Sequence, residues 1–70
     1  MATTREVADT YSAYRDKHDV AEAAAKTMAD YSLDEQGLVD ALGAEILSGS
    51  SDLKKAHAHR NEVHSHFTKK

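Results

Sequence analysis

Apolar and small side chains recur at spacings of four and three residues through the first part of the chain. The pattern continues without a slip for three heptads, which is typical of a coiled-coil seam. Thr3 and Glu6 have the form of a capping box, which would satisfy backbone N–H groups at a helix start. We therefore predict a long first helix over residues 4–31, with one face formed by Val7, Tyr11, Tyr14, His18, Ala21, Ala25 and Met28.

A second helix start lies within this predicted helix. In the segment DKHD, Asp19 is followed three positions later by Glu22, which is also a helix-start pattern. The unbroken spacing favours a continuous helix. A break near residues 16–19 would instead divide it into two shorter helices.

A second helix is predicted over residues 33–48, because Ser32 and Glu35 repeat the capping box. It is the most apolar part of the chain, and Gly49 is expected to end it. Its large aliphatic side chains fall on one side of a helical wheel. The members of this side are Leu38, Val39, Leu42, Ile46 and Leu47, of which Leu38, Leu42 and Ile46 are expected in the core.

A third helix is predicted over residues 52–68, with Ser50 or Ser51 as its cap. Its seam again steps by three and four residues, and its last residues are expected to fray. The seam consists of Leu53, Ala56, Arg60, Val63 and Phe67.

These patterns predict one small all-α domain over residues 1–70, with three helices, or four if the first helix breaks. The chain has no proline and only three glycines, so helix is favoured throughout. Only eleven residues are Leu, Ile, Val or Phe, and a chain of this size buries a thin core. Stability is therefore expected to need help from association.

A long first helix would leave part of its apolar face uncovered. It would span about 42 Å, whereas each of the other two helices would span about 25 Å. An uncovered apolar stripe usually marks an interface. We therefore predict that the chain self-associates or docks on a protein partner, as an accessory regulator or inhibitor, through Val7, Tyr11, Tyr14 and His18.

Charge is unevenly distributed and gives a second hypothesis. Residues 1–50 carry four basic and ten acidic side chains, whereas residues 51–70 carry five basic and two acidic ones. A basic, histidine-rich C-terminal helix could contact nucleic-acid phosphates or an acidic partner. The sequence pI of about 5.9 makes nucleic acid the weaker alternative. The candidate contact residues are Lys54, Lys55, Arg60, Lys69 and Lys70.

Arg60 occupies a seam position, where a buried guanidinium would need a carboxylate. We predict an ion pair with Asp40, with Glu45 or with an acid of a partner molecule.

Four of the five histidines lie in the last fourteen residues. Histidine titrates near pH 6.5, so these side chains could form a pH-responsive cluster. Protonation would tighten packing against acidic helices of the same chain, or loosen packing between two copies of the third helix. The histidines could equally be solvated residues beside the seam. As metal ligands, His59, Glu62 and His66 are weak candidates, because only two of them have a favourable helical spacing. No metal or other cofactor is therefore predicted.

The remaining chemistry argues against an enzyme. We find no phosphate-binding glycine loop, no HExxH motif and no cysteine. No segment approaches the length of a membrane span, and the N-terminus does not resemble a secretion signal. The sequence therefore predicts a non-enzymatic cytoplasmic protein that has no membrane partner.

Overall fold

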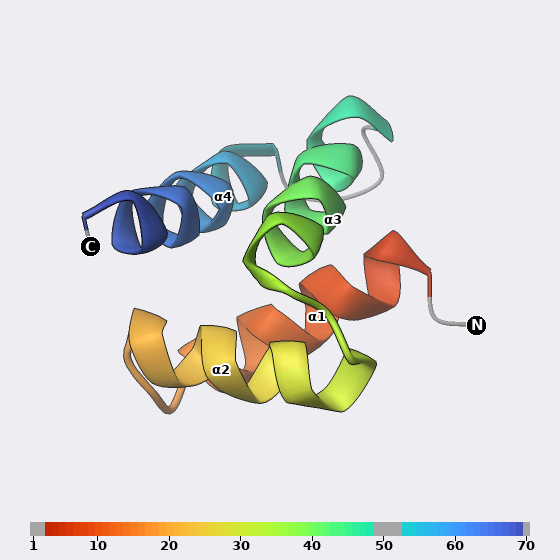
Figure 1. Ribbon diagram of the computed structural model, residues 1–70. Helices are drawn as coiled ribbons and strands as arrows, with labels where there is room; N and C mark the ends of the chain where they lie inside the picture. Colours follow the sequence, from red (N-terminus) through yellow and green to blue (C-terminus); the bar gives the residue numbers. More distant parts are fainter. Residues whose placement is uncertain (1–2, 49–52, 70) are drawn as a thin grey trace.

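The computed structural model describes residues 3–48 and 53–69, and this part of the chain forms four helices (Figure 1). They are α1 (Thr4–Arg15), α2 (Val20–Tyr31), α3 (Glu35–Ser48) and α4 (Leu53–Thr68). No strand occurs among the described residues. The all-α prediction is confirmed. The sequence analysis favoured three helices and gave four as the alternative, and the described residues form four.

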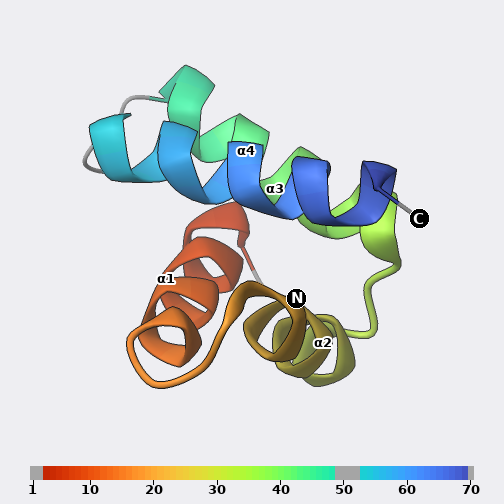
Figure 2. The same cartoon turned by 90° about the vertical axis from the view of Figure 1, so that its left-hand side faces the viewer.

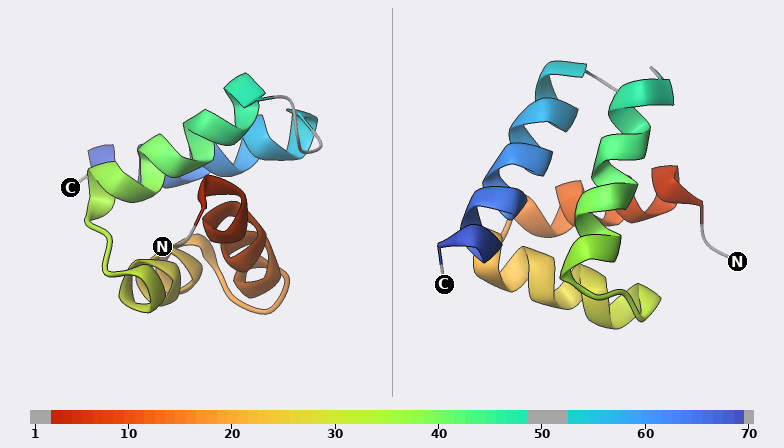
Figure 3. Two further views of the ribbon diagram at one scale, coloured as in Figure 1. Left: turned by 90° about the vertical axis from the view of Figure 1, so that its right-hand side faces the viewer. Right: turned by 45° about the horizontal axis from the view of Figure 1, so that its top comes forward.

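The four helices form two antiparallel hairpins that pack as two layers. Helices α1 and α2 make one layer, and α3 and α4 run side by side across it (Figures 2 and 3). The core lies between the layers and contains side chains from all four helices. Its fully buried members include Tyr11, Ala23, Ala24, Leu38, Leu42 and Val63.

The predicted first helix is broken at residues 16–19. The carbonyl of Tyr14 accepts hydrogen bonds from the backbone N–H groups of Lys17 and His18, at 3.0 and 2.8 Å, which closes α1 in a tight turn. The Asp19 side chain then accepts the backbone N–H of Glu22 at 2.9 Å and begins α2. A continuous helix was therefore the wrong choice, because the local cap overrides the heptad spacing.

The break also changes which residues of α2 face the core. Ala21 and Ala25, which continue the predicted seam, are exposed. Ala23, Ala24 and Thr27 are buried in their place. The turn at residues 16–19 resets the rotation of the second helix, so the seam ends with α1.

The connection between α2 and α3 differs from the predicted capping box. Ser32 adopts a left-handed conformation, with φ of 54°, and closes the end of α2. Asp34 caps α3 instead, accepting the backbone N–H of Gly37 at 2.7 Å. The predicted caps at Gly49, Ser50 and Ser51 lie outside the described residues.

The predicted exposed stripe on the first helix is absent, and this is the main correction to the sequence analysis. Val7 and Tyr11 are buried within the single chain, at 4% and 0% exposure. Tyr14 and His18 are half-buried, and each is engaged: Tyr14 donates to Asp30, and His18 Nδ1 lies 2.8 Å from a Glu22 carboxylate oxygen. The chain turns back at residues 16–19, α2 and α3 pack against α1, and α4 contacts Tyr11, so these side chains offer no apolar stripe to a partner.

The cap at Asp19 gives a first testable prediction. Asp19→Ala removes the acceptor of the Glu22 N–H and should lower the free energy of unfolding by about 1 kcal/mol. Urea denaturation would measure this loss. Asp16→Ala is the matched control, since it removes the same charge from the same turn, and its effect should stay within about 0.5 kcal/mol. Equal losses in the two variants would show that the cap does not hold the break.

Candidate functional site

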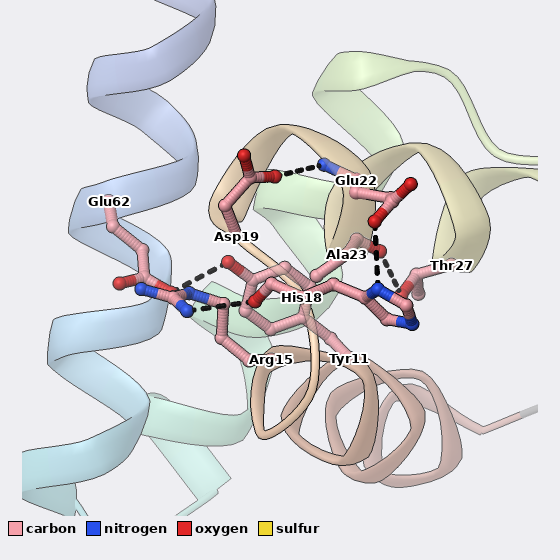
Figure 4. A network of polar contacts seen from close by, with 8 residues as sticks. All are labelled: Tyr11, Arg15, His18, Asp19, Glu22, Ala23, Thr27 and Glu62. Atoms are coloured by element: carbon pink, nitrogen blue, oxygen red, sulfur yellow. Dashed lines mark hydrogen bonds and ion pairs between the residues drawn. The ribbon is translucent and has the colours of Figure 1, made fainter.

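A polar network fixes the inward side of α4 against α1 (Figure 4). The carboxylate of Glu62 accepts hydrogen bonds from the Tyr11 hydroxyl at 2.7 Å and from Arg15 Nε at 3.0 Å. Arg15 also donates through Nη1 to the backbone carbonyl of His18 at 3.0 Å. One arginine therefore joins α4 to both α1 and the turn that follows it.

Burial raises the pKa of Tyr11, and its hydrogen bond to the Glu62 carboxylate raises it further. The hydroxyl consequently remains a hydrogen-bond donor at physiological pH. Since both groups are used in packing α1 against α4, we interpret this network as structural.

The C-terminal histidines do not form one cluster. The ring of His59 is half-buried and makes an edge contact with Tyr11, with ring centroids 5.0 Å apart. His66 packs against Phe67, whereas His57 and His64 line the outer side of α4. Burial lowers the pKa of His59, and nearby Lys55 and Arg15 lower it further, against an opposing effect of Glu62.

The metal candidates His59, Glu62 and His66 are not brought together as a ligand set. Among residues 3–48 and 53–69, no group of three or more His, Cys, Asp or Glu side chains could hold a metal ion. Glu62 is already occupied by Tyr11 and Arg15.

A groove runs between α3 and α4 on the surface of the molecule. We call it the outer groove, because its lining residues alternate along both helices with those that face α1 and α2. Its volume is about 510 Å³. It is lined by Gln36, Val39, Asp40, Gly43, Ala44, Ile46 and Leu47 of α3 and by His57, Arg60 and His64 of α4.

A second hollow of about 240 Å³ extends the outer groove towards the start of α3. It shares Gln36, Val39 and His64 with the larger hollow and adds Phe67 to the apolar lining. The two hollows together follow α3 from residue 35 to residue 47. At the rise of a helix this is a length of about 18 Å.

The apolar end of the outer groove is unusually exposed for large aliphatic side chains. Leu47 is 90% exposed, and neighbouring Ile46 is only half-buried. The sequence pattern placed both on the core side of the second helix, and Ile46 was expected in the core. Leu38 and Leu42 do occupy the core as predicted. The apolar arc of α3 is therefore wider than the core needs, and its edge forms the groove.

Arg60 lies at the middle of the outer groove and lacks the predicted ion pair within the chain. The carboxylate of Asp40 accepts from Gln36 Nε2 at 2.8 Å, and that of Glu45 accepts from the Thr4 hydroxyl at 2.9 Å. In the described part of the chain, Arg60 has a hydrogen bond of 3.4 Å to Asn61 and no carboxylate partner. The prediction of a pair with Asp40 or Glu45 was wrong. The third alternative, an acid from a partner, stays open.

Gly43 explains how Arg60 reaches this position. A Cβ atom at residue 43 would lie 3.7 Å from Arg60 Nε, so the guanidinium stem rests directly on the bare backbone of α3. The other predicted cationic residues are more peripheral. Lys54, Lys55 and Lys69 are exposed along α4, and Lys70 lies outside the described residues.

Comparison with known protein families, with curated proteins and with solved structures found no match. Of the helices described, none combines the length and the apolar character that a membrane crossing requires.

The inward position of His59 predicts a pH dependence of stability. Its lowered pKa in the folded state means that the unfolded chain binds the proton more readily. The contribution of neutral His59 is present above the ordinary histidine pKa of about 6.5 and is lost as the pH falls towards the lowered value.

His59→Gln should therefore flatten the decline of the unfolding free energy between about pH 7 and 5.5, as measured by urea denaturation at each pH. His57→Gln removes an exposed histidine from the same helix and should keep the wild-type slope. An unchanged slope in His59→Gln would contradict the assignment, whatever its stability at pH 7.

Proposed function

We propose that this chain is a small, non-enzymatic helical module that binds another protein through the outer groove of α3 and α4. The observation that carries the proposal is an open apolar groove with an arginine at its centre that has no acid partner within the described chain. A half-buried guanidinium in an open groove is free to pair with a carboxylate of a partner, through two parallel hydrogen bonds. An accessory or inhibitory role in the cytoplasm fits a domain of this size.

The groove also has the composition expected of a recognition surface. Small and aliphatic side chains of α3 line it together with polar groups, and Arg60 lies at its middle. Exposed apolar area of this kind is uncommon on a small soluble domain unless it contacts something. Arginine is one of the residue types enriched at protein interfaces, so its place beside apolar side chains is consistent with a binding surface.

The exposed side chain of Leu47 provides the test. The wild type and Leu47→Asp would each be fixed to an affinity matrix and exposed to a lysate of the native host. Leu47→Asp should lose a protein partner that the wild type retains, because the change puts a charge into the apolar end of the groove. At 90% exposure Leu47 contributes little to the core, so the fold should survive, as checked by circular dichroism.

Leu53→Asp is the matched control. Leu53 is 49% exposed and follows Leu47 closely in the chain, but it does not line the outer groove. It should retain the partner. The proposal fails if the same proteins bind all three chains, or if the wild type retains none that Leu47→Asp loses.

One observation favours nucleic acid as a second candidate. The only acid of the described α4 residues, Glu62, is turned inward and held by Arg15, so the exposed side of the helix carries no carboxylate. It presents Lys54, His57, His64 and Lys69 to solvent. This side could contact phosphates without reading bases.

A salt series with duplex DNA would test this second candidate. Binding through phosphates must weaken steeply as the salt concentration rises, because the release of counterions from the DNA into a more concentrated salt solution gains less free energy. Electrophoretic mobility shift or anisotropy at about 50 and 200 mM salt would show this. Undetectable binding at the lower concentration would remove the candidate, and Lys54→Gln with Lys69→Gln should weaken any binding that is seen.

A further inference from the structure

We infer that the occupant of the outer groove is an amphipathic helix of a different protein, which places a carboxylate on Arg60 between two apolar anchor residues. This inference rests on the proposed function and specifies the chemistry of the partner. It is carried by the order of the groove residues along α3 and α4 and by their charges.

The shape of the groove suits a helix. Two antiparallel helices form its walls over a length of about 18 Å, which matches about three turns of a third helix laid along them. Ala44 stands in the middle of the wall formed by α3, next to Gly43 on which Arg60 rests, and its small side chain leaves room for a partner helix. Amphipathic helices are commonly recognised in grooves of this kind.

The apolar contacts of the groove are separated by one helical repeat. Ile46 and Leu47 form one end, and Val39 with Phe67 forms the other. Val39 and Ile46 are seven residues apart, or about 10.5 Å along α3. A helix lying beside α3 would therefore meet these two sites with apolar residues at positions i and i+7.

Arg60 lies between the two apolar sites. It contacts α3 at Gly43, which is four residues from Val39 and three from Ile46. A carboxylate at position i+3 or i+4 of the partner helix would meet the guanidinium. Arginine and carboxylate can form two parallel hydrogen bonds, which makes the pairing specific as well as strong.

The charges around Arg60 select an acid over other groups. His57 and His64 flank it on α4 at spacings of three and four residues and share the same lining. Of the acids in the groove, Asp40 is already hydrogen-bonded to Gln36, and Glu35 stands at the far end beside Phe67. Arg60 is therefore the one Arg or Lys of the described groove lining and the group that an incoming acid would meet, whereas both ends offer apolar contact.

The same charges argue against a second copy of this chain as the occupant. A two-fold pairing of α3 with α3 across Gly43 would bring the two Arg60 side chains close to the symmetry axis, because each rests on its own Gly43. Like charges at the centre of an interface are costly. A different chain with an acid at this position avoids the repulsion.

Selection from a displayed library of fourteen-residue helical peptides would test the inference. The host peptide would be rich in alanine and randomised at five positions of one face, and the targets would be the wild type, Arg60→Gln and Leu47→Asp. On the wild type we expect enrichment of large apolar residues at positions i and i+7 with Asp or Glu at i+3 or i+4. Arg60→Gln should keep the apolar preference and lose the acidic one.

Fluorescence anisotropy with an enriched peptide would then give the size of the effect. Changing its central Glu to Gln should weaken binding to the wild type by about tenfold and binding to Arg60→Gln by much less, since only the wild type offers the charged donor. Circular dichroism would confirm that Arg60→Gln is folded. Arg60→Lys keeps the charge but not the paired hydrogen bonds, so it should lie between the two.

The remaining outcomes separate the two proposals. The wild type could select apolar residues without an acid, and Leu47→Asp could fail to select them. That result would overturn the inference and leave the groove as a binding site. No enrichment on the wild type would overturn the inference, and the capture experiment with Leu47→Asp would decide the proposed function alone. A wild-type dimer in sedimentation that Leu47→Asp dissociates would replace the foreign helix with a second copy.

Discussion

The carboxylate of Glu62 determines how α4 is turned relative to the rest of the molecule. It accepts hydrogen bonds from Tyr11 and Arg15 of α1, and its neighbour Val63 is fully buried in the core. Side chains two positions apart on a helix are rotated by about 200° and therefore point to nearly opposite sides. Holding Glu62 inward therefore turns Arg60 and His64 outward, to the side where α3 and α4 form the groove. The hydrogen bonds of Glu62 therefore affect both how α4 packs against α1 and which side chains α4 presents to the outer groove.

Local capping patterns predicted the elements of this fold better than the longer hydrophobic repeat did. The helical class, the cap at Thr3 and the approximate bounds of α3 and α4 follow from the sequence. The break after Arg15 was visible as the pairing of Asp19 with Glu22, but the heptad spacing favoured continuity. The spacing was misleading because alanines at two faces of α2 make either face acceptable, and burial of Ala23 and Ala24 depends on tertiary contacts alone.

The groove could not be predicted in the same way, because it depends on how two helices are rotated against each other. The apolar arc of α3 and the odd position of Arg60 were both visible in the sequence. Whether Leu47 faces the core or solvent is decided by how α3 is rotated against its neighbours, and only the structure shows this side chain at 90% exposure. The stripe on the first helix failed for the reverse reason: its residues found partners in α2 and α4 once the chain turned back.

Arg60 shows why an unmatched group can be more informative than a satisfied one. Asp40 and Glu45 both lie on the helix it crosses, yet each is engaged by an uncharged donor, Gln36 or Thr4. An arginine that served only to tie α4 to α3 would be best placed against one of these acids. It rests instead on Gly43, in a groove whose apolar end is formed by half-buried Ile46 and exposed Leu47. The simplest physical account is that its carboxylate comes from another molecule, and that the same molecule covers Ile46 and Leu47.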